Sequence, residues 1–387
     1  MTHPYQTEPL HRASFLERPN RFIVFADHDG ERRRTYVANP GKLNEILLPG
    51  TTEVLLAHKP HTKTKWESVG ARWDGRWDGD VERAVFLNTG RVNDVAEAYL
   101  SRGLVPGLEE ATVLNREETV GESRFDFLLD TPEGELLLEV KSVTLVEREL
   151  ALFPDARSER ATKHVQELTE LSRKGVNTAV LFMVQGRAER LLPDLHNDYD
   201  FACALREASK HLPIYAISTA PTLDGEDRLC FPAKPERLTV PWDRLDPILD
   251  DAGLYLAVLE LKTATAVEIG ALGTFDFKPG FYTYIGSAQV GLAKRMRRHK
   301  RTRKRLHWHI DYLRNAVDSV TTFAIRGATE ESALADDVAR LGRRFPRNFG
   351  ATDCSDDGHL IYTPHDPVPT PEFQQLLTEW RHRRVFE

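Results

Sequence analysis

One short segment, residues 124–141, constrains the chain more than any other. It holds two apolar, strand-like runs joined by a turn, with Asp126, Glu139 and Lys141 at positions where a core prefers aliphatic residues. Because side chains alternate across a strand, Glu139 and Lys141 point to the same face, and Asp126 on the preceding strand can face them. The segment therefore predicts a β-hairpin on which two carboxylates and one ammonium group converge.

These three residue types suit the hydrolysis of phosphodiester bonds. Carboxylates are hard oxygen ligands for Mg²⁺ or Mn²⁺, and a bound ion polarises the phosphate and lowers the pKa of an attacking water. We expect Asp126 and Glu139 to be metal ligands, while Lys141 orients the water or neutralises charge on the phosphoryl oxygens. The alternative is a surface hairpin that carries an ordinary Glu/Lys pair.

Further stretches support the nuclease interpretation by resemblance. They follow one another at 20–22, 39–43, 47–50, 63–65, 88–89, 121–127, 139–145, 153–156, 163–164 and 184–185. Residues from about 15 to 220 thereby resemble the sugar fermentation stimulation protein family, whose second domain resembles PD-(D/E)XK nucleases. The resemblance implies a DNA-binding, OB-fold-like first domain, and places Asp126, Glu139 and Lys141 at catalytic positions. At Asn39-Pro40-Gly41 the family usually has Asn-Thr-Gly, so a hydroxyl is lost and the turn is stiffened.

Composition sets outer limits on the protein. A chain of 387 residues with 41% hydrophobic content is expected to form two or three domains. The net charge of -7 argues against a globally basic surface, so any nucleic acid must bind to local patches. Three scattered cysteines indicate a reducing setting, and no apolar run is long enough to cross a membrane, so we expect a cytoplasmic protein.

Residues 1–86 are expected to form the OB-fold-like β-barrel, because short β-rich runs alternate there with Gly-containing turns. Basic side chains and tryptophans offer phosphate contacts and flat surfaces for stacking bases. Alternatively, the tryptophans pack in the core and the basic residues are solvated. The candidate nucleic-acid contacts are Arg33, Lys42, Lys63 and Lys65, together with Trp66, Trp73 and Trp77.

Residues 87–240 are expected to form the PD-(D/E)XK-like α/β nuclease core. A helix capped by Asn93, the hairpin, a polar helix at 158–173 and a buried strand at 178–184 fit the αβββαβ order of that superfamily. Glu97 is either a further metal ligand or a solvated helix residue. Candidate nucleic-acid contacts in this domain are Arg124, Lys163 and His164.

An acidic, proline-interrupted stretch at 241–252 predicts a linker, after which residues 253–365 form another domain. A second family resemblance is carried by the stretches 253–255, 269–270, 272–273, 280–288, 291–292, 295, 298–299, 308–313, 331, 334–335, 349–350, 353–354 and 359–360. They resemble a family of unknown function related to the GIY-YIG endonucleases, which implies a GIY-YIG-like α+β fold.

That second resemblance makes Tyr255 and Tyr284 the signature catalytic tyrosines, Arg295 the transition-state cation and Glu331 the single metal ligand. A phenol near a metal-bound water can relay a proton, and a guanidinium can clamp phosphate. The long gap between the tyrosines predicts an inserted hairpin around 278–280 that can displace Tyr255. Core aromatics and a helix-surface carboxylate are the alternative interpretations.

The densest run of charge, residues 294–305, interrupts an otherwise acidic chain. Such a dense positive segment in a negatively charged chain favours contact with a polyphosphate, although charge runs are often solvated helix faces. Its candidate nucleic-acid contacts are Arg297, Arg298, His299 and Arg301. Residues 366–387 carry apolar side chains at helical spacing and predict a docking helix.

The sequence as a whole predicts a multidomain α+β protein that acts as a metal-dependent nuclease on DNA or RNA, with Mg²⁺ or Mn²⁺ as cofactor. The C-terminal domain is expected to be a second nuclease or a substrate-binding aid. The alternative is a non-catalytic DNA-binding regulator of sugar metabolism with dormant sites. Nuclease cores of this type frequently pair, so a homodimer is also an expectation.

Overall fold

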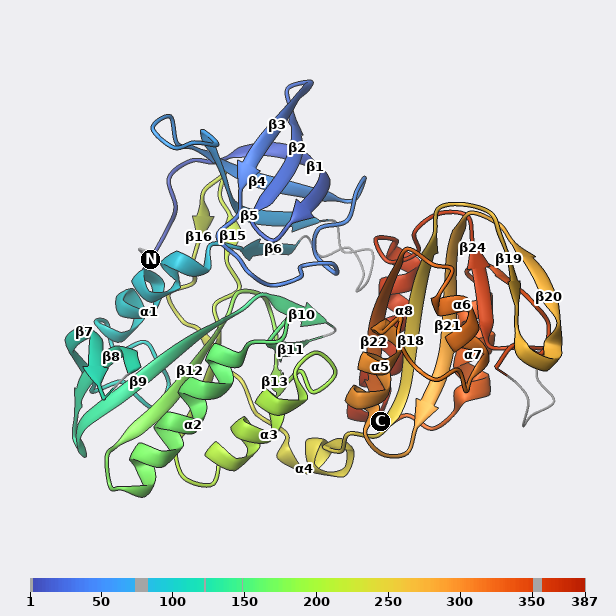
Figure 1. The fold of residues 1–387 in the computed structure, drawn as a ribbon. Coiled ribbons are helices and arrows are strands. Elements are labelled where there is room, and N and C mark those ends of the chain that lie inside the picture. The colour runs from blue at the N-terminus through green and yellow to red at the C-terminus, as the bar shows by residue number, and fades with distance from the viewer. Residues whose placement is uncertain (1–2, 74–82, 122, 148, 351–356, 387) are drawn as a thin grey trace. The chain divides into compact units, whose positions relative to one another are not determined.

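The computed structural model describes residues 3–73, 83–121, 123–147, 149–350 and 357–386 (Figure 1). The chain divides into two compact units, Met1–Trp242 and Asp243–Glu387. None of the helices in these described ranges is long and apolar enough to span a membrane.

The first unit opens with a closed five-stranded barrel. Its strands are β1 (His11–Asn20), β2 (Ile23–His28), β3 (Glu31–Tyr36), β4 (Thr52–His58) and β5 (Trp66–Trp73), and β6 (Arg83–Phe86) pairs with β5. The order is β3-β2-β1-β4-β5, and a parallel pairing of Tyr36 with Glu67 closes the barrel. Asp29-Gly30 turns the chain between β2 and β3, and the positive φ angles of both residues suit a two-residue hairpin.

A six-stranded mixed sheet forms the centre of the same unit. Its order is β17 (Glu236–Arg237), β14 (Ile214–Ser218), β12 (Thr178–Val184), β9 (Gly134–Val143), β8 (Ser123–Thr131) and β7 (Thr112–Val120). Strand β12 lies parallel to both of its neighbours and is buried along its whole length, as expected of a strand covered on both faces.

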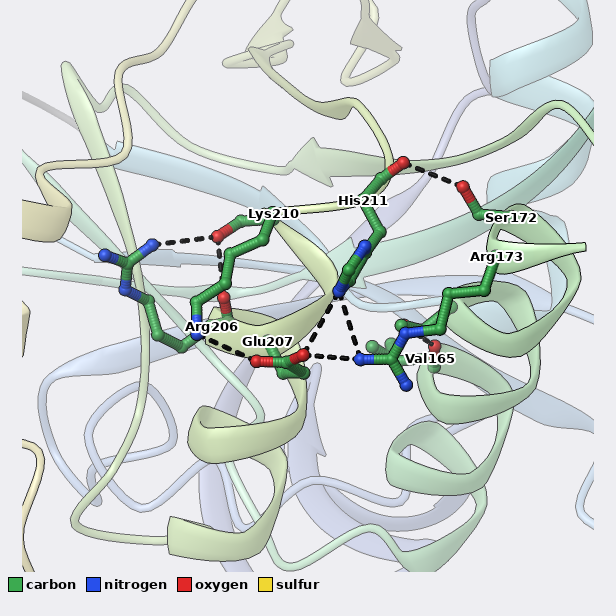
Figure 2. Close-up of polar contacts among 9 residues, drawn as sticks. Val165, Ser172, Arg173, Arg206, Glu207, Lys210 and His211 are labelled. Carbon is green, nitrogen blue, oxygen red and sulfur yellow. Dashed lines mark hydrogen bonds and ion pairs between the residues drawn. The ribbon is translucent and has the colours of Figure 1, made fainter. Parts of the chain in front are cut away.

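Helices cover the two faces of this sheet. Helix α1 (Val92–Leu100) joins one apolar cluster, whereas α2 (Glu159–Arg173) and α3 (Tyr199–Ala208) join the other. Glu207 of α3 accepts hydrogen bonds from Arg173 of α2, from Lys210 and from His211, at 2.5, 2.8 and 3.1 Å (Figure 2). This surface network ties α2 to the end of α3.

The barrel and the central domain are joined by more than one connection. The N-terminal segment runs along residues 227–231, with hydrogen bonds from Thr7 N to Leu229 O and from Leu10 N to Asp227 O of 3.0 and 3.1 Å. The remaining elements of the unit are η1 (Thr89–Arg91), β10 (Leu145–Glu147), β11 (Leu150–Phe153), β13 (Arg190–Pro193), β15 (Thr222–Leu223) and β16 (Leu229–Cys230).

The second unit is built on an antiparallel sheet of five strands. The order is β22 (Ser319–Arg326), β18 (Gly253–Leu261), β21 (Gly280–Ala288), β24 (Leu360–Thr363) and β23 (Arg343–Arg344). A separate hairpin, β19 (Thr265–Glu268) and β20 (Thr274–Phe277), is inserted between β18 and β21. Short helical turns α4 (Trp242–Leu245), η2 (Asp246–Ile248) and η3 (Gly270–Leu272) precede β18 or follow β19.

Helices cover both faces of this sheet as well. Helices α5 (Leu292–Lys300) and α6 (His309–Arg314) share one apolar cluster, and α7 (Glu331–Ala339) and α8 (Pro371–Phe386) share the other. Phe373, Leu377 and Trp380 of α8 are buried in it. The expected fold class is therefore confirmed as a closed barrel, a central α/β domain and a C-terminal domain of mixed α and β structure.

Candidate active site

A cleft of about 520 Å³ lies between the barrel and the central sheet. The three residues predicted from the hairpin, Asp126, Glu139 and Lys141, all line it. Strands β8 and β9 pair from the turn as far as Phe127 and Leu138, so Asp126 and Glu139 lie just beyond the last paired residues. The structure thus brings together the two carboxylates and the ammonium group.

Asp126 is held by two donors. Its Oδ2 accepts a hydrogen bond of 2.7 Å from the Val140 backbone N–H, and its Oδ1 accepts one of 2.8 Å from the Asn93 side chain on α1. Burial, reinforced by the nearby charge of Glu139, raises the pKa of Asp126 above its ordinary value. The charge of Lys141 and the hydrogen bonds from Val140 and Asn93 oppose this rise in the pKa without cancelling it.

Glu139 is only 3% exposed, and its two carboxylate oxygens differ in their partners. Its Oε1 accepts hydrogen bonds from Lys141 Nζ and, at 2.6 Å, from His164 Nδ1 of α2. Burial opposes its charge, but His164 and Lys141 outweigh that effect and lower its pKa. Its Oε2 is buried and has no hydrogen-bond partner within the described part of the chain.

The barrel supplies one wall of the cleft through the loop 39–43. Gly41 N–H donates to Asn39 Oδ1 at 2.9 Å, and Leu43 N–H donates to Asp155 Oδ2 at 2.8 Å. A Cβ added at Gly41 would lie 2.5 Å from Asp155 Oδ2, so only glycine allows this close approach. Burial raises the pKa of Asp155.

The side chains at this cleft do not form a complete protein cage for a metal. Among the described residues there is no group of three or more His, Cys, Asp or Glu side chains that could hold an ion by itself. Mg²⁺ commonly keeps several waters and is bound through one or two carboxylates, so Asp126 and Glu139 still fit such an ion. Glu97 instead binds Arg116 at 2.9 Å.

Most basic candidates of the first unit already have a polar partner. Arg33 pairs with Glu31, Arg124 with Glu117 and Lys163 with Glu167, at 2.6, 3.3 and 3.4 Å, and Lys42 donates to Asn197. Lys63 and Lys65 are exposed, and Trp66 packs against His11, His28 and His58. Trp77 and the Trp73 side chain lie outside the described residues.

In the second unit the two signature tyrosines lie side by side. Their ring centroids are 6.2 Å apart, on the adjacent strands β18 and β21. The inserted hairpin spans 265–277 rather than lying around 278–280, and it leaves Tyr255 beside Tyr284. Tyr255 Oη is 2.8 Å from His299 Nε2, and burial lowers the pKa of His299 to about 3, so this histidine is neutral. Burial also raises the pKa of both phenols.

Gly286 explains how Tyr255 fits against the neighbouring strand. The two residues are direct cross-strand partners, and a Cβ at Gly286 would lie 2.4 Å from Tyr255 Oη. The absence of a side chain at Gly286 therefore lets the phenol cross β21 and reach His299. The glycine of the Tyr-Ile-Gly motif is required here by packing.

Arg295 and Glu331 are engaged within the same unit. Arg295 Nη1 donates to Ser287 O at 2.7 Å and its guanidinium lies 4.7 Å above the Trp308 ring, while Glu331 Oε1 is 2.9 Å from His359 Nδ1. The charge of Glu331 contributes to the raised pKa of Tyr284 after burial, so the two are near one another.

The basic run divides into an internal and an external set. Buried Asp311 binds Arg298 at 2.7 and 2.9 Å and Lys304 at 2.7 Å, and the charged groups hold its pKa below the ordinary range despite burial. His299 is buried and does not lie on the outer surface. The external set, all exposed and without a carboxylate partner in the described ranges, is Lys294, Arg297, Lys300, Arg301, Arg303 and Arg305.

Sequence reasoning did not identify four residues that shape the cleft. Asn93 was expected to cap the helix, but it lies inside α1, whose N-cap is Arg91. Arg21, Asn39 and Asp155 had no assigned role, yet all four residues line the cleft. For Arg21, Asn39 and Asp155 the available signal was their place inside the stretches 20–22, 39–43 and 153–156, which carry the family resemblance. Positions 353–354 fall outside the part that the structure describes.

Comparison with known proteins agrees with the three-part fold. Residues 16–80 match the SfsA N-terminal OB domain, 90–225 match the sugar fermentation stimulation protein RE domain, and 254–382 match the domain of unknown function DUF123. A solved structure, Pyrococcus furiosus SfsA in complex with Ca²⁺, is 27% identical with a TM-score of 0.54, covering 62% of this chain and 99% of that one.

Curated relatives match the first unit over nearly their full length. The sugar fermentation stimulation protein homologue of Methanothermobacter thermautotrophicus is 37% identical over 238 residues, which is 61% of this chain and 95% of the relative. That of Clostridium tetani is 38% identical over 204 residues, 52% of this chain and 86% of the relative. The chain therefore belongs to the sugar fermentation stimulation protein family, and carries a DUF123 domain after the shared region.

Proposed function

We propose that the first unit is a divalent-metal-dependent nuclease that hydrolyses phosphodiester bonds of DNA or RNA in the cleft lined by Asp126, Glu139 and Lys141. The observation that carries this proposal is the buried Glu139 Oε2, which has no partner among the described residues and lies in a cleft shared with Asp126. An orphaned carboxylate oxygen costs free energy unless a ligand such as a cation occupies the site.

The residues fit Mg²⁺ or Mn²⁺, with Asp126 and Glu139 as the ligands. Such an ion supplies Lewis-acid polarisation of the phosphate and a water of lowered pKa. The relative from Pyrococcus furiosus is described in complex with Ca²⁺, another hard divalent cation with a preference for oxygen ligands, which supports this choice.

The chain's own groups have distinct tasks in this proposal. His164 Nδ1 and Lys141 Nζ both donate to Glu139 Oε1, which orients the carboxylate and directs its second oxygen away from them. An ionised carboxylate only accepts hydrogen bonds, so Nδ1 of His164 carries the proton. Lys141 also supplies positive charge where a phosphoryl group gains negative charge.

For the second unit we propose a substrate-binding role through its exposed cations. Six basic side chains on and after α5 have no carboxylate partner in the part of the chain that the structure describes, and they are complementary to a phosphate backbone. The set Tyr255, Tyr284, Arg295 and Glu331 is a candidate for a second, GIY-YIG-type cleavage site with Glu331 as metal ligand. Its polar groups largely satisfy one another, which favours the binding role.

The test is metal-dependent cleavage of plasmid DNA, single-stranded DNA and RNA by wild type, Asp126→Ala and Glu331→Ala. We expect cleavage by wild type with Mg²⁺ or Mn²⁺, its loss in Asp126→Ala and its retention in Glu331→Ala. Binding without cleavage in wild type would refute the proposal and support a DNA-binding regulator with dormant sites.

A further inference from the structure

Two large aromatic side chains stand exposed on the barrel. Phe22 is 47% exposed and Tyr36 is 40% exposed, and their rings are nearly parallel, with centroids 6.3 Å apart and planes inclined by 16°. Exposed apolar side chains scattered singly need no explanation, but a stacked pair forms a flat apolar surface of the kind that ligands use. We call Phe22 and Tyr36 the aromatic pair.

Backbone hydrogen bonds orient both rings of the aromatic pair toward the outer surface. Asn20 Oδ1 accepts hydrogen bonds from the N–H groups of Phe22 and Ile23 at 3.0 and 3.1 Å, which turns the chain between β1 and β2. Val37 N–H donates to Phe22 O at 3.0 Å, and Val37 is fully buried, so Tyr36 before it faces the opposite way. The rings are therefore held on the outer surface by the backbone.

Arg18 connects the aromatic pair to the wall of the cleft. Its Nη2 donates to Arg21 O at 2.6 Å and to Asn39 O at 2.9 Å, and its Nη1 donates to Gly41 O at 2.7 Å. Arg21, Asn39 and Gly41 all line the cleft that contains Asp126. One guanidinium thus joins the turn that carries Phe22 to the loop that faces the proposed reaction centre.

Unpaired positive charge flanks the same surface. Arg21 precedes Phe22 directly, and Arg34 lies two residues before Tyr36, on the same face of β3; both are exposed and have no carboxylate partner in the ranges described. The intervening arginines differ, since Arg32 pairs with Glu17 and Arg33 with Glu31. Free guanidinium groups beside a flat apolar surface are complementary to a phosphate backbone with an accessible base.

We infer that the aromatic pair stacks an unpaired nucleobase next to the phosphodiester held in the cleft, so that the substrate is a single strand or a strand with an unpaired base. The inference rests on the proposed nuclease function and adds its substrate class. Bases inside a duplex are stacked on each other and present no free face to a protein ring. Stacking is also tolerant of sequence, because every base has a π face.

The experiment measures binding of a single-stranded oligonucleotide with one 2-aminopurine, through its fluorescence, to the full chain carrying Asp126→Ala in Ca²⁺. Adding Phe22→Ala or Tyr36→Ala should remove fluorescence quenching and weaken binding roughly 5- to 150-fold, the range for one stacked base. Phe22→Leu keeps an apolar side chain and should still lose quenching. Leu114→Ala, at another exposed apolar residue of the unit, should bind as the parent does.

Three outcomes would overturn the inference. The first is unchanged quenching and affinity in both alanine variants. The second is an equal loss of affinity for a fully paired duplex, which would mean that the rings do not read unpaired bases. The third is a drop in molecular mass on size-exclusion when the pair is removed, which would make it an interface between copies. Absence of cleavage in wild type refutes the nuclease proposal alone, because this binding assay needs no cleavage.

Discussion

The cleft of the first unit and the tyrosine cluster of the second unit contain similar chemical groups, but these groups differ in their hydrogen-bond partners. The tyrosine cluster consists of Tyr255, Tyr284, Arg295 and Glu331. In the cleft, one oxygen of the buried Glu139 has no partner among the described residues. In the cluster, Tyr255 contacts His299, Glu331 contacts His359, and Arg295 binds a backbone carbonyl. Among the buried polar atoms of this cluster and its contacts that the structure describes, His299 Nδ1 lacks a hydrogen-bond partner.

Under the proposed function, that difference separates a site that binds a cation from one whose polar groups are stable without a ligand. A buried charge with an empty coordination direction destabilises the fold unless a cation binds, whereas a self-satisfied cluster stabilises the fold as it stands. We therefore expect metal to act on the first unit and packing changes to act on the second.

The largest expected effect is on cleavage. Asp126→Ala, Glu139→Ala and Lys141→Ala should each lower the rate of metal-dependent nicking by roughly 10²–10³-fold or more, because each removes a charge proposed to act on the reacting phosphate. Glu331→Ala is the matched change in the second unit and should retain the wild-type rate. An equal loss in Glu331→Ala would break the comparison.

The second largest expected effect is an increase in thermal stability when a divalent cation binds. Mn²⁺ or Ca²⁺ at about 100 times its Kd should stabilise wild type by about 2.7 kcal/mol, measured by the rise in melting temperature over an EDTA control. Glu139→Gln should abolish the rise, since it removes the charge that offsets the cation. Should Glu331→Gln abolish it instead, the ion binds in the second unit.

His164 should have an intermediate effect, as a positioning residue that does not touch the metal. Replacing it with Ala removes the donor to Glu139 Oε1 and should weaken metal affinity roughly 10- to 100-fold, read from a metal titration of the melting temperature. His164→Asn can place an amide N–H near the same point and should recover part of that affinity. If Asn and Ala behave alike, His164 only fills space.

In the second unit, Tyr255→Phe should have a small effect on stability and none on cleavage. It removes the hydroxyl that contacts His299, which should cost about 1 kcal/mol in the free energy of unfolding, measured by urea denaturation. A fall in the nicking rate of this variant would show that the phenol takes part in catalysis and would contradict the self-satisfied assignment.

The smallest expected effect is on the melting temperature when Glu207 on the surface is changed. This variant shows how much an ordinary surface ion pair contributes, for comparison with both sites. Hydrogen bonds from Lys210 and His211 lower the pKa of Glu207 from 4.5 to about 2. The stabilisation is therefore present above about pH 4.5 and is lost as the pH falls through about 2. Glu207→Gln should melt slightly below wild type at neutral pH, and the two melting curves should converge in acid.

The sequence predicted the hairpin well because the signal was local. Alternation alone placed Glu139 and Lys141 on one face, and the short turn brought Asp126 beside them. Partners separated widely in the chain carried no such signal. Leu43 N–H meets Asp155 across 112 positions, and Asn93 meets Asp126 across 33, so neither contact follows from strand or helix periodicity.

The basic run shows another limit of sequence reading. Counting charges could not distinguish cations that bind Asp311 from those that face solvent, because the carboxylate comes from the next helix, α6. His299 likewise has hydrophilic neighbours in sequence, yet it lies on the inner face of α5 against Tyr255. Helix orientation relative to the sheet decided both cases.

The hydrogen bonds of Thr7 and Leu10 with residues 227–231 have a consequence for the independence of the barrel. Thr7 and Leu10 are hydrogen-bonded to a segment more than 200 positions later, which follows the central domain in the chain. The barrel therefore cannot be separated as an independent domain without losing its hydrogen bonds to residues 227–231. The second compact unit starts at Asp243 and contains the DUF123 match at 254–382, so this unit does not interrupt the connection.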